Sequence, residues 1–427
     1  MSAESFSDSR SHGPGGDQIR ILAVGNMYPP QHAGGYERAW QQAMEHARAL
    51  GHDVRVLTSN YREDPHRPED DPDVHRTLRW YWDLERYEFP RLTPAQRLAL
   101  ERANGAELRR HLESFGPDLV AWWSMGCMSL SLIERVRRAR IPAVFVVHDD
   151  WLVYGREHDQ WIRAWSRPRR EVAGRIAERL FGIPVHVDFD RAGPFVFNSR
   201  YTLERARQAG VNATSMTVVH PGIEERFLER LDARPWSWRL ACVGRIDRQK
   251  GIDTAVAALG HLPPSATLAV WGAGDQGYVA EMRELATRIG VEKRVTFNGF
   301  ADPDTLRSVY AETDAVVFPV RWSEPFGLVP LEAMGMGRPV VTTSRGGTAE
   351  FVEDGANALV FDADDARGLA ACLERLAGDE SLRARLCDGG WRTACRYPAG
   401  AFAERTVAEM IGAAGEPLPA ARTPVAT

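Results

Sequence analysis

Several features that define common protein classes are scarce in this sequence or missing from it. Its 427 residues include only five cysteines and no CxxC pair, so neither a disulfide framework nor a zinc cluster is indicated, and a reducing cytoplasm is expected. No apolar run approaches the roughly 18 residues of a membrane span. The 53 basic and 58 acidic residues nearly balance, which argues against a dedicated nucleic-acid binder.

Three well-known catalytic motifs are absent as well. There is no GxxxxGK[ST] P-loop, no HExxH and no GxSxG, which weakens the case for an ATPase, a zinc protease or an α/β-hydrolase. Lysine is almost missing, because every basic residue other than Lys250 and Lys293 is an arginine. A lysine at a chemically suggestive position therefore stands out.

Short apolar runs alternate with longer helical patterns along the chain, which is typical of βα units and mostly parallel sheets. We expect an α/β fold with two Rossmann-like, doubly wound domains facing across a cleft. The predicted divisions are a disordered tail (1–18), an N-terminal domain (19–220), a linker (221–238), a C-terminal domain (239–399), a helix (400–414) and a second disordered tail (415–427).

The strands expected from these runs are Arg20–Gly25, Asp53–Ser59, Asp118–Ser124, Pro142–His148, Pro194–Ser199, Arg239–Gly244, Thr267–Gly272, Arg294–Gly299, Ala315–Val320, Pro339–Ser344 and Ala358–Phe361. The stretch Tyr61–Tyr87 has no clean period and is interpreted as a loop or a short hairpin. Arg156–Phe181 is interpreted as a helical stretch. Because open α/β sheets bind ligands beyond the carboxyl ends of their strands, the loops after strands are the candidate sites.

The strongest candidate site is the segment RWSEPFGLVPLEAMGMGRPVV, where a strand is expected to end and a helix to begin. Glu324 precedes this helix, and Glu332 is expected about two turns inside it. Unpaired amides at a helix start can seat an anion. Carboxylates beside such a seat suit sugar hydroxyls, and an acidic helix start that complements the dipole is the alternative. The amides in question are those of Phe326, Gly327 and Leu328.

Three further loops follow predicted strands. After Gly244 come Arg245 and Lys250, which would hold a diphosphate leaving group or form a solvated basic loop. Gly34–Gly35 leaves the backbone bare at the first helix start, for a ligand or for a plain tight turn. His148, followed by two aspartates, stands at a strand end, where a structural role is equally open.

The segment WGAGDQG matches the dinucleotide motif GxGxxG, so a nicotinamide-dependent oxidoreductase is the main alternative function. Two observations count against it. The motif lies in the second βα unit of its domain, whereas dinucleotide folds use the first. Phe300–Ala301 also occupies the place where an acidic residue is expected at the end of the next strand, with Asp302 slightly beyond.

Taken together, the motifs resemble those of the family 4 glycosyltransferases, retaining enzymes of the GT-B fold. The resemblance runs from about Arg20 to Tyr397 and is most specific in the second domain. The segments that carry it are VGRIDRQKG, EPFGLVPLEAM, GRPVV, GGTAEFV and DGANALVF there, and YPPQHAGGYE, VHDDW and FNSRYTLE in the first domain. Ala358 departs from the glycine that is frequent in the family, and only a loop effect is expected.

The resemblance implies a nucleoside-diphosphate sugar as donor, linked to UDP, GDP or ADP, and a hydroxyl acceptor whose identity stays open. It implies no bound metal and no other cofactor. A GT-B sugar-nucleotide epimerase is a second alternative. By this resemblance, Arg245, Lys250 and the Phe326–Leu328 amides would bind the diphosphate, and Gly244 would belong to the same donor loop. Glu332 would bind the ribose, and Glu324 and His148 would bind the sugar. Gly34 and Gly35 would line the phosphate and acceptor side, and Gly299 and Phe300 would lie near the nucleobase.

Fewer residues in the sequence indicate where an acceptor would bind. The first domain is rich in tryptophan, and these rings are expected either to stack on a sugar or apolar acceptor or to belong to the core. The arginine-rich stretch Arg156–Arg179 suggests the hypothesis of peripheral contact with an anionic membrane, with a solvated surface helix as the alternative. The tryptophans concerned are Trp80, Trp82, Trp122, Trp123, Trp151, Trp161 and Trp165.

Overall fold

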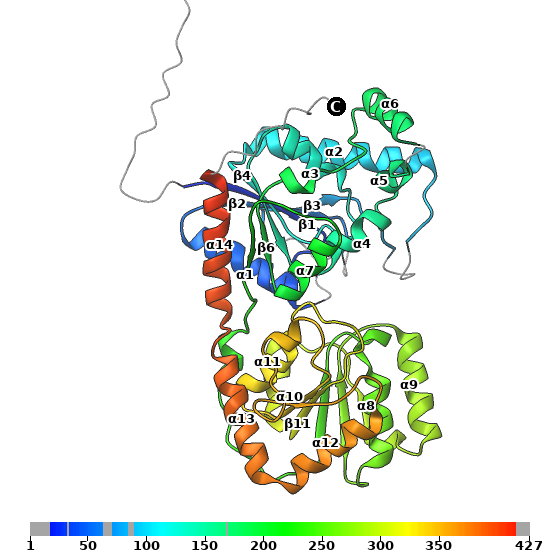
Figure 1. Ribbon diagram of the computed structural model, residues 1–427, viewed down its shortest axis with the longest axis vertical. Helices are drawn as coiled ribbons and strands as arrows, with labels where there is room; N and C mark the ends of the chain where they lie inside the picture. Colours follow the sequence, from blue (N-terminus) through cyan, green and yellow to red (C-terminus); the bar gives the residue numbers. More distant parts are fainter. Residues whose placement is uncertain (1–17, 32–33, 63–70, 84–88, 168–169, 416–427) are drawn as a thin grey trace, which may run out of the picture.

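The protein consists of two α/β units, one above the other in Figure 1, each built on a parallel sheet. The computed structural model describes residues 18–31, 34–62, 71–83, 89–167 and 170–415. The two tails predicted to be disordered therefore lie almost entirely outside the described residues. Every strand pairing with a described register is parallel, and helices cover the sheet faces, as is usual for parallel sheets.

The first unit has a seven-stranded sheet in the order β3-β2-β1-β4-β5-β6-β7. Its strands β1, β4 and β5 are almost fully buried, as expected of a sheet covered by helices on both faces. The elements are β1 (Arg20–Gly25), α1 (Gly35–Ala49), β2 (Asp53–Ser59), β3 (Val74–Leu78), α2 (Pro94–Phe115), β4 (Leu119–Trp122), α3 (Ser131–Arg138), β5 (Ala143–Val147), α4 (Trp151–His158), α5 (Gln160–Trp165), α6 (Glu171–Phe181), β6 (Phe195–Phe197), α7 (Arg200–Gln208) and β7 (Met216–Val218).

The second unit has a six-stranded sheet in the order β10-β9-β8-β11-β12-β13. The elements are β8 (Arg239–Val243), α8 (Ile252–Ala258), β9 (Thr267–Trp271), α9 (Gln276–Arg288), β10 (Val295–Phe297), α10 (Pro303–Glu312), β11 (Ala315–Phe318), α11 (Leu328–Gly335), β12 (Val340–Thr342), β13 (Leu359–Val360), α12 (Ala366–Gly378), α13 (Glu380–Ala394) and α14 (Ala399–Gly415).

In each sheet the strand order reverses once, between β1 and β4 and between β8 and β11. At such a point the loops after the two central strands leave in opposite directions and open a crevice for ligands. The loops that follow β1, β4, β8 and β11 are therefore the places where the architecture itself favours a site. All four of these loops carry residues that are discussed below.

The structure contradicts the expectation for one segment and adds detail to two others. The stretch interpreted as a loop or hairpin contains β3, a parallel edge strand paired with β2, because its alternating residues Val74, Arg76 and Leu78 are buried. The arginine-rich helical stretch is divided into α4, α5 and α6, since Asp159 caps α5 and interrupts the first helix. Strand β7, at the far edge of the sheet, was not expected at all.

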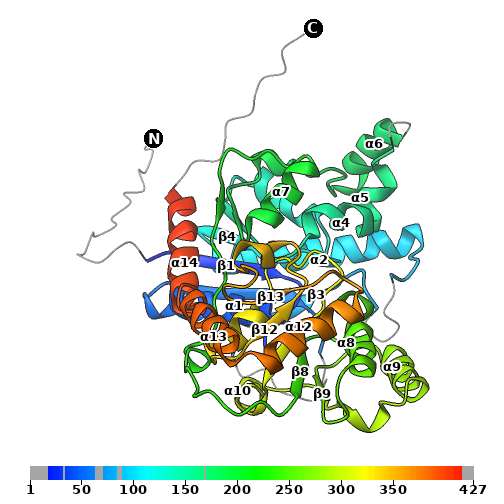
Figure 2. The same cartoon turned by 60° about the horizontal axis from the view of Figure 1, so that its bottom comes forward.

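The C-terminal helix α14 leaves the second unit and packs on the first, where it contacts α1, β4 and β5 (Figures 1 and 2). Phe402, Val407 and Met410 are buried there in the same apolar cluster as Trp40. The two segments that cross between the units are hydrogen-bonded to each other, through Ile223 to the stretch that precedes α14. The units are therefore joined by a paired crossing rather than by a single strand of chain.

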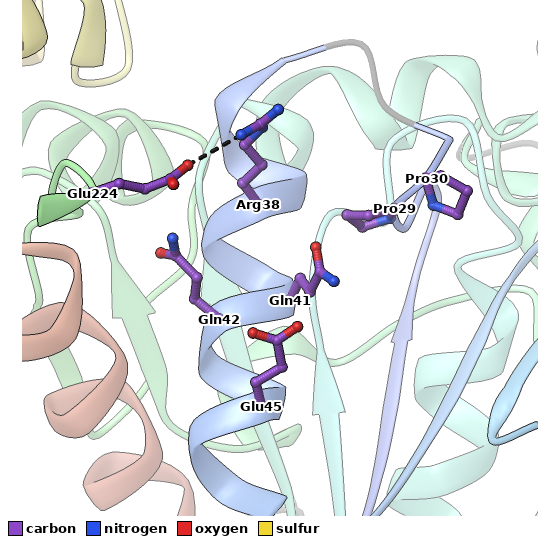
Figure 3. A pocket seen from close by; sticks show the side chains of 7 residues that line it. All are labelled: Pro29, Pro30, Arg38, Gln41, Gln42, Glu45 and Glu224. Carbon is purple, nitrogen blue, oxygen red and sulfur yellow. Dashed lines mark hydrogen bonds and ion pairs between the residues drawn. The ribbon is translucent and has the colours of Figure 1, made fainter. Parts of the chain in front are cut away.

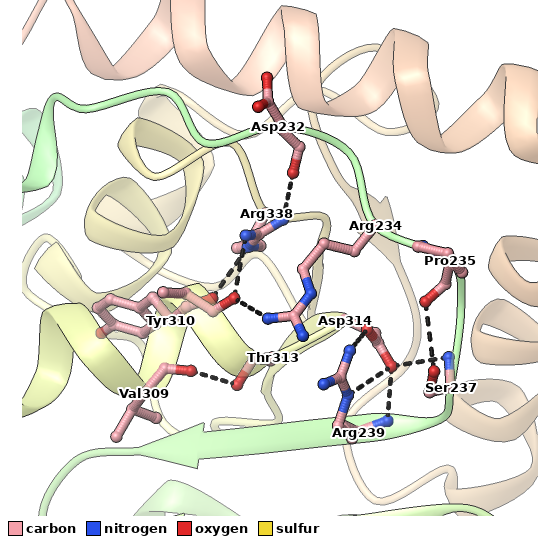
Figure 4. Close-up of polar contacts among 11 residues, drawn as sticks. Asp232, Arg234, Pro235, Ser237, Arg239, Val309, Tyr310, Thr313, Asp314 and Arg338 are labelled. Carbon is pink, nitrogen blue, oxygen red and sulfur yellow. Dashed lines mark hydrogen bonds and ion pairs between the residues drawn. The ribbon is translucent and has the colours of Figure 1, made fainter.

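The linker is fastened to the second unit by arginine and aspartate side chains (Figure 4). Arg338 donates to the carbonyl oxygen of Asp232 at 3.3 Å and to two carbonyl groups at the end of α10. Asp314 accepts from the backbone amide of Ser237 at 2.9 Å and pairs with Arg239 at 2.8 Å. These contacts fix the linker to the second unit, which leaves the paired crossing near Ile223 as the joint between the units.

Candidate active site

The predicted diphosphate loop lies where β8 and β11 diverge. Gly244 follows β8 and has a φ of 140°, and Gly244, Arg245, Lys250 and Phe318 line a small hollow between the two strand ends. Asp247 shapes the loop by accepting from the amide of Lys250 at 3.2 Å and from the Arg245 guanidinium at 2.9 Å. The sequence motif thus places both predicted cations on one edge of the second sheet.

Lys250 and Glu324 form an ion pair at the centre of this edge. The Lys250 Nζ atom lies 2.9 and 3.0 Å from the two carboxylate oxygens of Glu324, and the two side chains are only 13% and 12% exposed. The Trp322 indole N–H donates to the same carboxylate at 2.7 Å. The ammonium also lies 5.5 Å from the centroids of the Trp322 and Phe318 rings. Aromatic faces, a cation and a carboxylate therefore share one half-buried site.

The loop that carries Glu324 is held by the segment GGT. The Gly347 amide donates to the Glu324 carbonyl at 2.7 Å, and a Cβ on Gly346 would lie 2.4 Å from that oxygen. Gly346 has a φ of 69°, so a glycine is needed there for both space and conformation. The sequence alone indicated no role for this segment and none for Trp322.

Helix α11 presents its amide end to this site. It begins at Leu328, and its N-cap residue Gly327 has a φ of 92° and supplies no side-chain cap. A Cβ on Gly327 would lie 2.7 Å from the Thr348 hydroxyl. The amides of Phe326, Gly327 and Leu328 thus lie at or just before the positive end of the helix dipole, and they are suited to an anion.

Glu332 lies just over one turn inside α11, not two, because the helix begins at Leu328. Burial raises the pKa of its carboxyl to about 7, against the opposing effect of a 2.8 Å hydrogen bond from the Tyr310 hydroxyl. The negative charge of Glu224 raises this pKa further, whereas Arg38 lowers it. Glu332, at the border between the two units, therefore changes its protonation state near neutral pH.

Helix α1, two prolines after β1 and the linker line an open polar pocket of about 280 Å³ (Figure 3). Arg38 of α1 pairs there with Glu224 of the linker at 3.0 Å. The other lining residues shown are Pro29, Pro30, Gln41, Gln42 and Glu45. The charge of Arg38, which lines this pocket, also lowers the pKa of Glu332, the residue predicted to bind the ribose.

The two predicted glycines of the first unit lie at the interface between the units. Gly34 is the N-cap of α1, and Gly35 is its first residue. A Cβ on Gly35 would lie only 3.1 Å from Cδ1 of Leu328, at the start of α11. The amide ends of α1 and α11 therefore face each other across the interface, although no sequence pattern indicated this pairing.

His148 follows β5 and is 6% exposed. Burial lowers the pKa of its imidazole to about 3, so the ring is neutral at physiological pH. Phe402 of α14 packs edge-on against it at 5.3 Å between ring centroids, and Tyr36 lies at 6.1 Å. Within the described part of the chain, its Nε2 atom is buried with no hydrogen-bond partner. The contact with Tyr36 connects His148 to the Gly34–Gly35 turn.

Asp149 is the centre of a buried polar cluster that the sequence did not reveal. Burial raises the pKa of its carboxyl to about 6. The Tyr154 hydroxyl donates to it at 2.8 Å and the Ser124 hydroxyl at 3.3 Å, and the Tyr36 hydroxyl donates to Asn26 nearby. Asn26, Ser124 and Asp149 follow β1, β4 and β5, and Tyr36 and Tyr154 belong to α1 and α4, so the cluster lies beside the switch point between β1 and β4. The sequence treated Asp149 only as a neighbour of His148.

The remaining candidates lie around this centre. Gly299 follows β10, and its carbonyl accepts from the Gly272 amide at 2.7 Å. Phe300 is exposed beside it. Of the tryptophans, Trp122, Trp123 and Trp151 are completely buried, which identifies them as core residues. No group of three or more His, Cys, Asp or Glu side chains in the described ranges is placed to hold a metal ion.

The GAGDQG segment does not form a phosphate cradle. Its Asp275 caps α9, and the carboxylate accepts from the amides of Gly277 at 2.8 Å and Tyr278 at 3.3 Å. A cofactor pyrophosphate would need those amides. A Cβ on Gly274 would collide with the Ile246 carbonyl at 2.2 Å, so this glycine serves packing. The oxidoreductase alternative is not favoured.

Two family models match the chain. One, described as glycosyl transferases group 1, matches residues 238–379, and the other, described as Glycosyltransferase Family 4, matches residues 33–227. The chain belongs to the family 4 glycosyltransferases. Together the two models span both units, including the two helix starts that face each other, and they identify sugar transfer as the reaction class of this glycosyltransferase.

Two curated relatives illustrate the range of the family. The chain is 38% identical over 151 residues to the lipopolysaccharide core biosynthesis glycosyltransferase LpsE of Rhizobium meliloti, which covers 35% of this chain and 43% of LpsE. It is 27% identical over 392 residues to a glycogen synthase of Mycobacterium tuberculosis, covering 86% and 88% of the two proteins. The chain thus spans less than half of LpsE.

Solved structures identify the fold of this glycosyltransferase as GT-B. Sucrose-phosphate synthase from Thermosynechococcus elongatus superposes with a TM-score of 0.71 at 20% identity, covering 93% of this chain and all of that one. Anabaena HepE in complex with UDP-glucose superposes with a TM-score of 0.65 at 23% identity, covering 92% and 100%. No helix among the described residues is long and apolar enough to cross a membrane.

Proposed function

We propose that the protein is a retaining, metal-independent glycosyltransferase that moves a hexosyl group from a nucleoside-diphosphate sugar to a hydroxyl acceptor. The observation that carries this proposal is the contact between Lys250 and Glu324 beside the amide end of α11. A cation suited to a diphosphate and a carboxylate suited to sugar hydroxyls stand side by side there. The two halves of a nucleotide sugar would need this arrangement.

The donor would lie along the edge of the second sheet. Its diphosphate would bind the Lys250 ammonium and so break the ion pair with Glu324. The freed Glu324 carboxylate would then accept hydrogen bonds from the sugar hydroxyls. Arg245 and the Phe326–Leu328 amides add positive potential for the diphosphate, and Glu332 would accept from the ribose hydroxyls. The UDP-glucose complex of the structurally similar HepE supports a donor of this class.

The same groups account for the chemistry. As the bond between the sugar carbon and the β-phosphate oxygen breaks, negative charge grows on the diphosphate and positive charge on the sugar. Lys250, Arg245 and the α11 dipole stabilise the first charge, and they do so without a metal ion. The acceptor oxygen forms its bond on the departing face and passes its proton to the phosphate, which retains the anomeric configuration. Neutral His148 would hydrogen-bond the sugar and would not act as an acid.

The acceptor would bind on the first unit, next to the Asp149 cluster. A carboxyl with a pKa of about 6, a hydroxyl group and an amide follow β5, β4 and β1 there, and α4 adds the Tyr154 hydroxyl. Such groups suit hydrogen bonds to an acceptor with several hydroxyls, whether a glycan, a glycolipid or a small metabolite. All five cysteines are free, which supports a cytoplasmic location as part of the proposal.

Thermal stabilisation by UDP, GDP, ADP, their sugar conjugates and NADH tests the donor proposal, with and without EDTA. We expect one nucleoside diphosphate and its conjugates to raise the unfolding temperature equally in both conditions. Stabilisation by NADH alone, or complete loss of the effect in EDTA, would contradict it. Retention is tested separately, by the anomeric configuration of the glycoside formed from the identified donor and a mixture of oligosaccharide acceptors.

A further inference from the structure

Helix α6 carries an unusual share of the exposed apolar surface of the protein. Four of the eight large apolar side chains exposed in the described part of the chain belong to it: Val172 (62% exposed), Ile176 (53%), Leu180 (72%) and Phe181 (38%). The other four, Leu50, Ile289, Phe300 and Ile411, are distributed over separate elements. Exposed apolar residues that cluster on one face indicate a binding surface, whereas isolated ones need no explanation.

A surface helix usually packs on the protein through its large apolar residues, whereas α6 packs through its small ones. Its buried residues are the small ones, Gly174 and Ala177, while Val172, Ile176 and Leu180 are more than half exposed. A Cβ on Gly174 would lie 3.2 Å from Cβ of Trp165, so a small residue is needed for this close approach. The outward residues recur at positions 172, 176 and 180, which places them on one face of the helix.

The charges around this apolar face are predominantly positive. Arg170, Arg175 and Arg179 are exposed on or next to α6. Arg102 of α2 lies over the Phe181 ring, with 5.6 Å between the guanidinium carbon and the ring centroid. Of the two acids, Glu178 is turned toward the protein and pairs with Arg138, so Glu171 alone contributes an exposed negative charge.

The position of α6 leaves its outer face accessible. Both overall views place it at the outer edge of the first unit, beyond α5 and away from the second unit (Figures 1 and 2). Its 11 residues span about 16 Å, which is about half the thickness of a bilayer core. A face about 16 Å long and about 10 Å wide is also far smaller than the roughly 800 Å² that each partner contributes to a stable protein interface.

We propose that α6 is an in-plane anchor that binds the surface of an anionic bilayer. Val172, Ile176 and Leu180 enter the boundary between headgroups and acyl chains, and the flanking arginines bind lipid phosphates. The apolar face provides the insertion, and the arginines provide the preference for negative charge. The small residues Gly174 and Ala177 hold the helix on the protein while its large residues bind lipid.

Co-sedimentation of the full chain with vesicles tests this anchor. We expect binding to phosphatidylcholine vesicles that contain about 30 mol% phosphatidylglycerol, weak binding to pure phosphatidylcholine, and loss of binding at about 0.5 M salt. The double variant Ile176→Glu/Leu180→Glu should bind at least about tenfold more weakly. The matched control Ile289→Glu/Ile411→Glu alters exposed isoleucines at the end of α9 and in α14, and it should bind as the wild type does.

A second pair of variants separates charge from insertion. Arg175→Gln/Arg179→Gln should weaken the salt dependence of binding, and the control Arg288→Gln/Arg385→Gln, with exposed arginines elsewhere, should leave it unchanged. No binding of the wild type to anionic vesicles would overturn the proposal, as would full binding of the α6 variant. Dimer formation through α6, detected by light scattering, would also overturn the proposal. Nucleotide stabilisation of each variant reports separately on folding and on the donor site.

Discussion

Lys250 and Glu324, 74 residues apart in the sequence, form a direct ion pair with Nζ–Oε distances of 2.9 and 3.0 Å. The two residues lie on the loops that follow β8 and β11, which are adjacent strands at the switch point of the second sheet. A nucleotide sugar that binds here would separate them, because its diphosphate attracts the cation and its hydroxyls attract the carboxylate. The pair thus keeps each group in place before the donor arrives.

Removing either partner should reduce turnover strongly. We expect Lys250→Ala and Glu324→Ala each to lower kcat/KM by about 10²–10³, because both groups act on charge that develops during transfer. Lys293→Ala is the matched control, since Lys293 is the only other lysine, is exposed, and precedes β10, whereas Lys250 follows β8. Circular dichroism should show an unchanged fold. Wild-type rates in both variants would contradict the site.

Trp322 is expected to be a positioning residue for Glu324. Trp322→Phe keeps the ring but removes the indole N–H that donates to the carboxylate at 2.7 Å. We expect kcat to fall by about tenfold while the affinity for the free nucleoside diphosphate stays unchanged, because that ligand lacks the sugar. Trp236→Phe is the control, since the buried Trp236 N–H has no hydrogen-bond partner in the described structure. A parallel loss of nucleotide affinity would indicate a structural role instead.

Nucleotide binding should depend on the charge of Glu332. Its carboxyl is mostly protonated below its pKa of about 7, and only the carboxylate accepts hydrogen bonds from both ribose hydroxyls. Affinity should therefore rise by about tenfold between pH 6 and 8 in titration calorimetry. In Glu332→Gln only the titration of the ligand itself should remain. Tyr310→Phe removes a hydrogen bond that lowers this pKa, so it should move the midpoint upward.

The raised pKa of Glu332 also makes the stability of the protein depend on pH. The folded-state pKa of Glu332 lies above the unfolded value of about 4.5, so the folded protein binds this proton more tightly. The contribution of Glu332 to the free energy of unfolding is therefore most favourable below about pH 4.5 and decreases up to about pH 7. Glu332→Gln should remove this part of the pH dependence in urea unfolding. An unchanged profile would contradict the burial of the charge.

Gly35 should be required for the approach of the two units. A Cβ there would lie 3.1 Å from the Leu328 side chain, so Gly35→Val should hold the amide ends of α1 and α11 apart. We expect kcat/KM to fall by about tenfold or more, because catalytic geometry tolerates little displacement. Leu328→Ala in the same chain should restore part of the activity by making room. Gly400→Val is the control, since nothing lies within 4 Å of that position.

Much of the second unit could be predicted because its site residues lie in continuous motifs. The segments VGRIDRQKG and EPFGLVPLEAM placed Lys250 and Glu324 correctly after β8 and β11, since local hydrophobic pattern identifies strands and the loops that follow them. The first unit was harder to predict. Asn26, Ser124 and Asp149 come from three separate loops and Tyr154 comes from α4, and nothing local distinguishes them from ordinary polar residues.

The sequence alone determined the two-sheet α/β architecture and the residue types at the strand ends, because apolar periodicity and glycine positions are local properties that the chain displays directly. The tertiary structure decided which of these residues meet. It joined Lys250 to Glu324, placed Gly35 against Leu328, and packed α14 on the first unit beside His148. It also turned the large residues of α6 outward. Such contacts depend on strand order and helix docking, which no local pattern encodes.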